Sequence, residues 1–183
     1  MFILFGLGTI FFIILIIFSF PQFSPIPYFP SNKKDLKLIL KSLKIKNDQT
    51  IIDLGAGDGM IIFEAAKYAF EKELNTQFIA TEINPILLSI MFLRRLFHKN
   101  KNNIKILYAD MFTMNYHLSS IINHPSLTFY LYISPWFLDK TVLNIKKQIK
   151  KYNIVSYMYQ IPSLKNIENK SKGNIHDIFT YTI

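Results

Sequence analysis

The feature that most restricts the fold of this chain is a glycine-rich turn, DLGAGDG, at residues 53–59. The apolar run 50–54 predicts a short buried strand that leads into the turn, and the apolar positions of 60–74 predict a helix that follows it. Glycine permits backbone conformations that other residues avoid, so the chain can pass close to a ligand here. The first N–H groups of the helix are free to bind that ligand. The segment therefore predicts a ligand-binding strand–turn–helix unit of an α/β fold.

The rest of residues 31–183 continues the alternation of strands and helices. Strands are expected at 50–54, 77–81, 104–108, 127–133, 154–160 and 178–183, and helices at 32–44, 60–74, 84–98, 118–122 and 137–151. Ser31 is expected to cap the first helix and Asn84 the third, and residues 166–174 are expected to form a hairpin loop or a mobile segment. This order predicts an α/β fold with a doubly wound, mostly parallel sheet that helices cover on both faces.

Acidic residues also follow the second and third predicted strands. Glu82 ends the second strand and Asp110 follows the third, and in a doubly wound sheet the carboxyl ends of adjacent strands line one crevice. A carboxylate at Glu82 can accept both hydroxyls of a ribose, while Asp110 and Met111 offer a carboxylate and an apolar surface to an adenine ring. The glycine spacing departs from the G-x-G-x-x-G of dinucleotide sites. Asp58 inside the turn suits a cationic or zwitterionic ligand better than a pyrophosphate.

The glycine turn has the pattern D-L-G-x-G-D-G, Glu with Asn-Pro follows the second strand, and Asp follows the third. This series of motifs resembles that of the class I S-adenosylmethionine-dependent methyltransferases. The resemblance covers residues 31–183 and implies a Rossmann-like sheet of seven strands. It implies that Asp53, Gly55 and Gly57 surround the methionine part of S-adenosylmethionine, Glu82 the ribose and Asp110 the adenine. The final helix of the family is expected to be missing and the last two strands short, because only 22 residues follow position 161.

The segment PYFPS at residues 27–31, together with a hydrophobic leader, narrows the resemblance. It is similar to the membrane-anchored lysine methyltransferases of the adenine nucleotide translocase and of ATP synthase subunit c, and to their prokaryotic relatives. This implies methylation of protein lysine at a membrane, with Tyr28 and Ser31 closing over the cofactor site.

The end of the fourth predicted strand, Ser134-Pro135-Trp136, resembles the motif with which amino-group methyltransferases hold the substrate nitrogen. Ser134 and Trp136 are therefore predicted to be catalytic. The alternative is that Pro135 begins a helix and Trp136 fills the core. No general base stands out in the sequence. Together with Trp136, the aromatic residues Tyr28, Tyr130 and Tyr132 could hold a cationic lysine through their ring faces.

Charged residues are absent from the first 32 positions. All 21 basic and 12 acidic residues lie in 33–183, so the net charge of +9 belongs to that part. Residues 1–20 include 16 apolar ones, and a helix of about 20 residues matches the thickness of a bilayer core. A single-pass transmembrane anchor at 1–20 and a Pro-rich linker at 21–30 are expected. The basic residues that follow place the domain 31–183 on the cytoplasmic side. A cleaved signal and a buried core helix are the alternatives.

The absence of cysteine excludes a disulfide scaffold, thiolate metal sites and a cysteine nucleophile, and no metal site is predicted. Methylation of RNA or of a small molecule is a second hypothesis, which rests on basic residues at Arg94, Arg95, Lys146, Lys147, Lys150 and Lys151. Anionic lipid explains these residues without nucleic acid, so a nucleic-acid partner is not favoured. A third hypothesis is a cofactor-binding membrane protein without catalysis.

Overall fold

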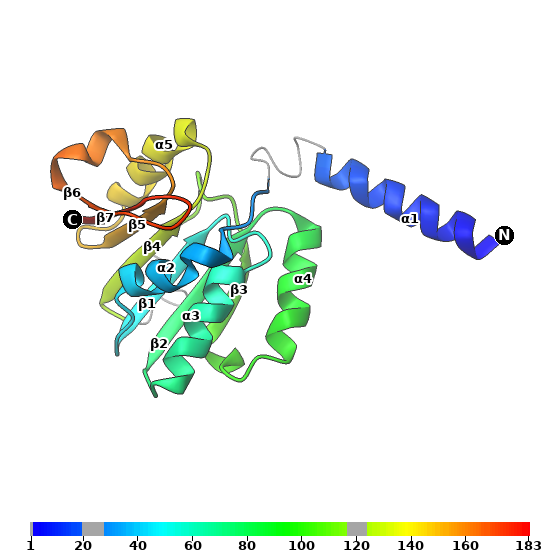
Figure 1. The fold of residues 1–183 in the computed structure, drawn as a ribbon, viewed down its shortest axis with the longest axis horizontal. Helices are drawn as coiled ribbons and strands as arrows, with labels where there is room; N and C mark the ends of the chain where they lie inside the picture. Colours follow the sequence, from blue (N-terminus) through cyan, green and yellow to red (C-terminus); the bar gives the residue numbers. More distant parts are fainter. Residues whose placement is uncertain (1, 20–27, 117–123) are drawn as a thin grey trace.

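A computed structural model describes residues 2–19, 28–116 and 124–183 (Figure 1). Residues Phe2–Ser19 form helix α1. Within the described ranges, none of the helices combines the length and the hydropathy that crossing a membrane requires. The structure therefore does not confirm the transmembrane helix predicted for residues 1–20. The helix predicted at 118–122 and most of the linker predicted at 21–30 lie outside the described residues.

Within the described residues, seven strands form one sheet in the order β3-β2-β1-β4-β5-β7-β6. The strands are β1 (Gln49–Leu54), β2 (Thr76–Glu82), β3 (Ile104–Tyr108), β4 (Ser126–Leu131), β5 (Asn153–Tyr157), β6 (Glu168–Ser171) and β7 (Ile178–Thr182). Strands β1 to β5 pair in parallel, and β7 runs antiparallel to both β5 and β6. The prediction of a doubly wound, mostly parallel sheet is confirmed. The register sets Leu54 level with Thr81 in β2 and with Leu131 in β4, so the carboxyl ends of the central strands meet at one edge.

The helices divide the core into two layers, one on each face of the sheet (Figure 1). They are α2 (Leu36–Leu43), α3 (Met60–Glu71), α4 (Pro85–Leu96) and α5 (Pro135–Lys146), with 3₁₀ turns at Lys33–Asp35, Lys101–Asn103 and Pro162–Ile167. Ile39 of α2, Phe63 of α3 and Met91 of α4 are buried on one face. Leu138 and Val142 of α5 are buried on the other. Strand β1 is buried along its whole length between the two layers, as is typical of a central strand in a parallel sheet.

The C-terminal part differs from the prediction in one element. Strand β6 occupies residues that were expected to form a loop. Its sequence, ENKS, carries no apolar alternation, so it forms through its backbone pairing with β7 and not through burial of its own side chains. Between β5 and β6 the described chain forms only a 3₁₀ turn, and β6 and β7 are four and five residues long.

One of the two predicted helix caps is confirmed. The side-chain oxygen of Asn84 accepts the N–H groups of Ile86 and Leu87 at the start of α4. The cap predicted at Ser31 is wrong, because a 3₁₀ turn precedes α2 and moves the capping position one residue along. Asn32 accepts the Lys34 N–H at 3.0 Å in its place, and Ser31 is free to enter the site described below.

Asp35 joins the two ends of the domain. Its side chain is fully buried and accepts the backbone N–H groups of Asn174, at 2.6 Å, and of His176, at 2.9 Å. It also accepts the N–H of Ile175 and the Tyr157 hydroxyl, the latter at 2.8 Å. Burial raises the pKa of Asp35, but these hydrogen bonds outweigh it and hold the pKa below its usual value. We call this cluster the Asp35 clasp.

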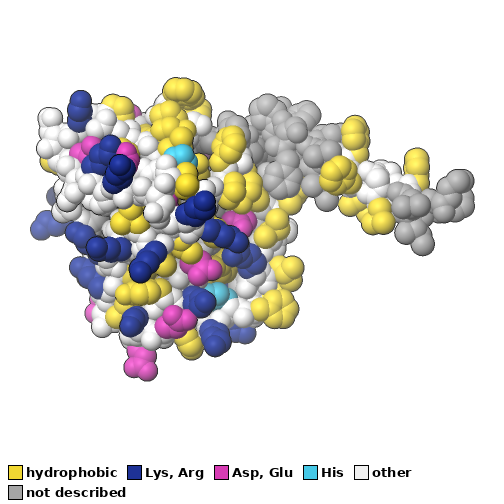
Figure 2. All heavy atoms as spheres, in the orientation of Figure 1, with side chains coloured by type: hydrophobic (Ala, Val, Ile, Leu, Met, Phe, Trp, Pro, Cys, Tyr) yellow, Lys and Arg dark blue, Asp and Glu magenta, His cyan; other side chains and the backbone are white. Residues whose placement is uncertain are grey.

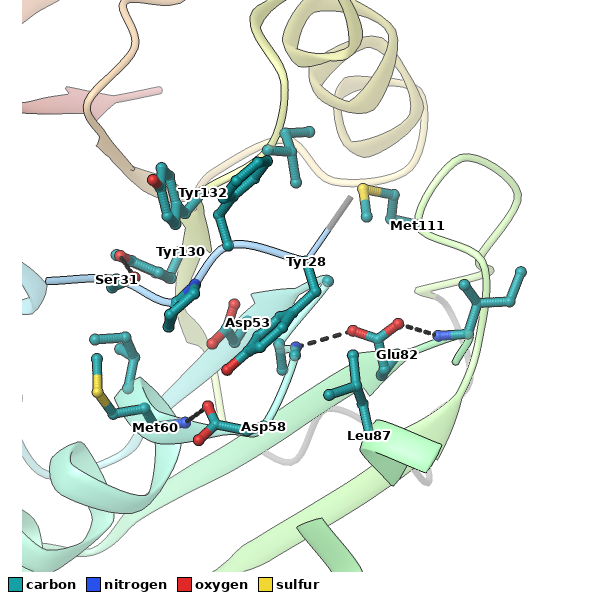
Figure 3. Close-up of a pocket in the computed structure, with 18 of the residues that line it drawn as sticks. Tyr28, Ser31, Asp53, Asp58, Met60, Glu82, Leu87, Met111, Tyr130 and Tyr132 are labelled. Atoms are coloured by element: carbon teal, nitrogen blue, oxygen red, sulfur yellow. Dashed lines mark hydrogen bonds between the residues drawn. The ribbon is translucent and has the colours of Figure 1, made fainter. Parts of the chain in front are cut away.

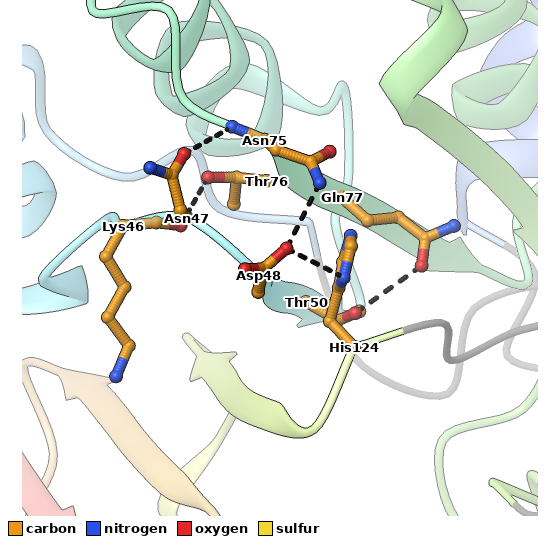
Figure 4. A network of polar contacts seen from close by, with 8 residues as sticks. All are labelled: Lys46, Asn47, Asp48, Thr50, Asn75, Thr76, Gln77 and His124. Carbon is orange, nitrogen blue, oxygen red and sulfur yellow. Dashed lines mark hydrogen bonds and ion pairs between the residues drawn. The ribbon is translucent and has the colours of Figure 1, made fainter.

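A second polar network lies at the amino ends of β1 and β2 (Figure 4). The Asn75 N–H donates to the side-chain oxygen of Asn47 at 2.8 Å, and the Asn75 amide donates to Asp48 at 3.1 Å. The Thr76 hydroxyl donates to the Lys46 carbonyl at 2.7 Å. The network ties the starts of the two strands together, at the opposite edge of the sheet from the acidic strand ends.

Candidate functional site

The carboxyl ends of the central strands open into a cavity (Figure 3). Its empty space, counted together with the part that is open to solvent, is about 810 Å³. All the residues predicted to bind the cofactor line it: Tyr28, Ser31, Asp53, Gly55, Gly57, Glu82, Asp110 and Met111. The structure thus brings together residues that are spread over more than eighty positions of the chain.

The glycine turn needs glycine for both conformation and space. Gly55, Gly57 and Gly59 have φ angles of +78°, +60° and +77°, in the left-handed region. A side chain on Gly57 would collide with the ring of Tyr28, and a Cβ on Gly55 would lie 2.8 Å from the terminal methyl carbon of Met111. The turn therefore presents bare backbone to the cavity.

Glu82 is held by the backbone around it. One carboxylate oxygen accepts the Gly57 N–H at 2.9 Å, and the other accepts the N–H groups of Ile83 and Asn84 at 2.8 and 2.9 Å. Each carboxylate oxygen has room for about two hydrogen bonds. The oxygen that binds Gly57 can therefore accept a further donor, such as a ligand hydroxyl, from a fixed position.

Asp53 lies near the end of β1, lines the cavity and is only 3% exposed. Its carboxylate accepts no hydrogen bond from any residue in the described ranges. Burial raises the pKa of Asp53 well above its usual value, and the nearby carboxylates of Glu82 and Asp58 raise it further. A buried carboxylate without a partner is costly. Its presence at a cavity wall favours a ligand that brings a positive charge.

Asp58 does not offer a free charge to a ligand. Arg94 of α4 lies 2.8 Å from one oxygen of its carboxylate and donates to its carbonyl at 2.7 Å. The other oxygen accepts the Met60 N–H at the start of α3, at 3.1 Å. The Arg94 guanidinium also lies over the ring of Phe63, 4.7 Å from its centre. The prediction that Asp58 suits a cationic ligand is therefore corrected, because its carboxylate already has partners within the fold.

The same contacts correct the view of the arginine pair as a basic surface. Arg94 is engaged with Asp58, and the Arg95 side chain donates to the carbonyl oxygens of Lys101 and Ile104. Both arginines therefore fix the turns around α4. Sequence reasoning missed the ion pair because its two residues lie 36 positions apart, with no local pattern to join them.

The segment before α2 forms one wall of the cavity (Figure 3). The ring of Tyr28 packs against Gly57, and burial, helped by the charge of Asp58, raises the pKa of Tyr28 to about 12. The Ser31 hydroxyl lies 2.7 Å from the hydroxyl of Tyr130 at the end of β4, and both side chains are buried. This bond fixes the segment against the sheet.

The Ser31–Tyr130 bond gives a prediction for stability. Ser31→Ala leaves the Tyr130 hydroxyl buried without that partner, so we expect a loss of about 1–2 kcal/mol in the free energy of unfolding. Tyr130→Phe is expected to cost a similar amount. The double variant should cost clearly less than the sum of the two, as chemical denaturation of the full chain would show. Strictly additive losses would mean that the two hydroxyls do not interact.

Asp110 and Met111 lie in a turn that follows β3. One oxygen of Asp110 accepts the Phe112 N–H at 2.9 Å, and the Asn144 amide of α5 donates to the Met111 carbonyl at 3.2 Å. These bonds hold the turn at the cavity wall. Ile83 and Leu87 also line the cavity. Ile83 directly follows Glu82 at the strand end, and Leu87 lies in the first turns of α4, so their closeness to Glu82 in the chain was the signal that could have identified them.

Ser134 and Trp136 are not among the residues that line the cavity. Pro135 begins α5, as the structural alternative predicted. Trp136 is 82% exposed, however, so it does not fill the core. The strand residue before them, Ile133, does line the cavity, so the two residues follow its wall directly in the chain. Their catalytic roles stay predictions.

A scan of the sequence against protein-family profiles found no match, and neither did a search of curated proteins. Solved structures do resemble the fold. An RNA methyltransferase from Salinibacter ruber, in complex with S-adenosyl-L-homocysteine, is 18% identical with a TM-score of 0.68 over 85% of this chain and 94% of that one. A precorrin-6y C5,15-methyltransferase from Geobacter metallireducens is 16% identical with a TM-score of 0.56 over 85% and 93%.

A third structure, an S-adenosylmethionine-dependent O-methyltransferase from Thermotoga maritima, is 11% identical with a TM-score of 0.61 over 85% of this chain and 66% of that one. At such identities the likeness shows the fold alone. These three proteins act on different kinds of molecule by their names, so they do not define an acceptor for this chain. The chain has the Rossmann-like fold of the S-adenosylmethionine-dependent methyltransferases.

Proposed function

We propose that this chain is an S-adenosylmethionine-dependent methyltransferase. The observation that carries the proposal is the carboxylate of Asp53, which lines the cavity without a hydrogen-bond partner among the described residues, beside a turn of three glycines with positive φ. S-adenosylmethionine fits this arrangement because it brings an ammonium group for Asp53, hydroxyls for Glu82 and a flat apolar ring for Met111.

Each cavity residue has a task in this proposal. Asp53 and the backbone of the glycine turn hold the methionine part, Glu82 the ribose, and Asp110 with Met111 the adenine. Tyr28 and Ser31 close the cavity on the side of the N-terminal segment. The cofactor supplies an activated methyl group on a sulfonium. The chain's own contribution is to align acceptor and donor and to exclude water.

We propose a protein lysine as the methyl acceptor. Tyr28, Tyr130 and Tyr132 line the cavity, and aromatic faces attract ammonium groups and their methylated forms. Burial raises the pKa of each of the three hydroxyls, so the rings stay neutral at physiological pH. A lysine must lose its proton before it can attack, and its pKa of about 10.4 falls when the amine leaves water. No histidine is among the described residues that line the cavity.

The function is tested with the full chain in two steps. Calorimetric titration with S-adenosylmethionine and S-adenosylhomocysteine measures binding. Incubation with methyl-labelled cofactor and with membrane, soluble-protein and RNA fractions then shows which molecule takes up label. Label on protein lysine supports the proposal. Label in RNA alone would favour the second hypothesis, and the exposed lysines at the end of α5 would then be its contact surface. Binding without transfer to any fraction would favour a non-catalytic protein.

The variant Trp136→Ala distinguishes an effect on binding of the methyl acceptor from an effect on binding of the cofactor. If Trp136 packs on the substrate, we expect methyl transfer to fall by roughly 3- to 30-fold, the range that a lost cation–π contact implies. Cofactor affinity should not change, because Trp136 does not line the cavity. Leu143→Ala is the matched control, since Leu143 is also exposed on α5. Unchanged turnover in the Trp136 variant would remove this residue from the site.

We further propose that the chain acts at a membrane, with residues 1–20 as its attachment and the domain on the cytoplasmic side. The support is the absence of charge from the first 32 residues and the exposure of apolar side chains such as Phe5, Phe11 and Phe12 in α1. Because the chain has no cysteine, Lys165→Cys creates a unique label site. An impermeant maleimide should label it in inverted but not in right-side-out vesicles. Release of the chain by alkaline carbonate would contradict the attachment.

A further inference from the structure

Helix α4 carries an apolar face that nothing in the described fold covers. Ile90, Phe92, Leu93, Leu96 and Phe97 are each at least 40% exposed, and Phe97 reaches 83%. At about 100° per residue the first four fall on one continuous side of the helix, and Phe97 follows directly after its last residue. We call these five residues the α4 apolar face. Among the exposed positions of residues 89–97, Ser89 is the only one with a polar side chain.

The opposite side of α4 accounts for the packing of the helix. Leu87, Leu88 and Met91 are buried in the core, and α4 packs on β3, the edge strand of the sheet. Figure 2 shows hydrophobic side chains along the right-hand edge of the domain, where Figure 1 places α4. The packing of α4 on the domain therefore uses its buried side and does not need apolar side chains on the exposed one. An exposed patch of this kind marks an interaction surface.

The charges around this face select its partner. Lys99 and Lys101 are exposed just beyond Phe97, and Lys67 and Glu64 of α3 line a hollow with Leu93 and Phe97. Arg94 and Arg95 are engaged within the fold, while residues 85–109 contain no acidic residue, so the exposed charge that follows the face in the chain is basic. A symmetric pair of chains would set these basic residues against their own copies, which opposes self-association through α4. Exposed Phe and Leu beside Lys and Arg are instead typical of helices that lie in the surface of an anionic bilayer.

We propose that the α4 apolar face docks on an anionic lipid bilayer, with Lys99 and Lys101 at the headgroups. Both lysines are exposed at the end of the helix that carries Phe97. The other end of α4 lies at the cavity, since Leu87 and the nearby Ile83 line it. Docking therefore sets the cavity beside the lipid surface. This contact is separate from any attachment through residues 1–20, and it does not depend on the identity of the reaction.

The full chain, which lacks cysteine, allows a direct test. Phe97→Cys carries a polarity-sensitive fluorophore on the α4 apolar face, and Leu143→Cys carries the same group on exposed α5 as the matched control. Both proteins are mixed with vesicles of phosphatidylcholine alone and of phosphatidylcholine with phosphatidylglycerol. We expect a blue-shifted, brighter emission at position 97 with the anionic vesicles only, and none at position 143. Replacing Lys99 or Lys101 with Gln should lower the ratio of inserted to free label by about fivefold for each lysine.

Each other outcome overturns the proposal. An unchanged signal at position 97 means that α4 does not meet the bilayer. An equal change at positions 97 and 143 means that the chain adsorbs without orientation. A change without vesicles that grows with protein concentration assigns the face to a second copy. Titration of both labelled proteins with S-adenosylhomocysteine runs in parallel, so that failure of the docking surface is distinguished from failure of the cofactor site or of the fold.

Discussion

Asp53→Asn is expected to weaken the binding of S-adenosylmethionine by about 10- to 100-fold, the range for a lost hydrogen bond to a charged group. The same change should make the folded chain without ligand more stable at neutral and alkaline pH. Asp53 is a buried carboxylate with no hydrogen-bond partner among the described residues. The negative charge of Asp53 would attract the ligand but destabilises the folded chain without ligand. Asparagine keeps the shape of the side chain and removes the charge.

The pH dependence follows from the raised pKa of Asp53. Between its unfolded pKa, about 3.9, and the higher folded value, the folded state binds more protons than the unfolded state. Stability is therefore lost as the pH rises through the folded pKa. Asp53→Asn removes this loss, so its advantage in melting temperature over the natural chain should grow with pH. Affinity of the natural chain for the cationic ligand should rise over the same interval, because the ligand binds the ionised carboxylate, and this rise should vanish in the variant.

Calorimetry and thermal melting of the full chain between pH 5 and pH 9 measure both effects. Glu71→Gln is the control, since it removes an exposed carboxylate outside the cavity. A variant that binds the cofactor as tightly as the natural chain would show that Asp53 does not contact it. A lower melting temperature for Asp53→Asn across the whole range would show that the charge is stabilised in the fold after all.

Asp35→Asn is expected to destabilise the domain by about 2–4 kcal/mol, because an amide cannot accept all the hydrogen bonds of the Asp35 clasp. The carboxylate accepts three backbone N–H groups and a tyrosine hydroxyl. The new NH₂ group would face backbone donors and leave at least one buried N–H unpaired. Denaturant unfolding of the full chain measures the loss, and Asp177→Asn, near the same turn but partly exposed, is the comparison. A loss within about 0.5 kcal/mol, the usual range for surface changes, would contradict the assignment.

The acid response of Asp35 has the opposite sign to that of Asp53. Its folded pKa is lowered, so its contribution is complete above the unfolded pKa and is lost as the pH falls through the folded value. The gap in stability between the natural chain and Asp35→Asn should therefore be full at pH 7 and narrow below about pH 4. A gap that does not change with pH would mean that the ionisation of Asp35 has no part in it.

The central part of the fold could be predicted because its signals are local. The buried run of β1, the glycine turn and the cap at Asn84 each occupy neighbouring residues, and parallel strand order then brings Asp53, Glu82 and Asp110 to one edge. For this reason every residue predicted to bind the cofactor lines a single cavity. The side chains that meet at the carboxyl ends of parallel strands can be predicted from sequence, because parallel pairing brings these ends to one edge of the sheet.

The remaining features depend on partners that are distant in the chain. Ser31 could cap a helix or bond to Tyr130, 99 positions away, and only the tertiary fold decides. From the sequence, Arg94 is expected on the surface as part of a basic pair, but in the fold its side chain forms an ion pair with Asp58. Strand β6 has no pattern of its own and follows from β7. In each case a local rule was overruled by a contact that forms only when the domain closes.

The Asp35 clasp also sets an order for the assembly of the site. Asp35 accepts backbone hydrogen bonds from residues that lie 139 to 141 positions further along the chain. Contacts between residues so far apart in sequence form slowly. The segment from Tyr28 to Ser31, which forms a wall of the cavity, directly precedes Asp35. During synthesis on the ribosome, the bonds of Ser31 to Tyr130 and of Asp35 to Tyr157 can form first, and the three backbone hydrogen bonds of the Asp35 clasp form only after residues 174–176 have emerged. A nascent chain can therefore form the central sheet and its acidic strand ends before the wall of the cavity has all of its anchors.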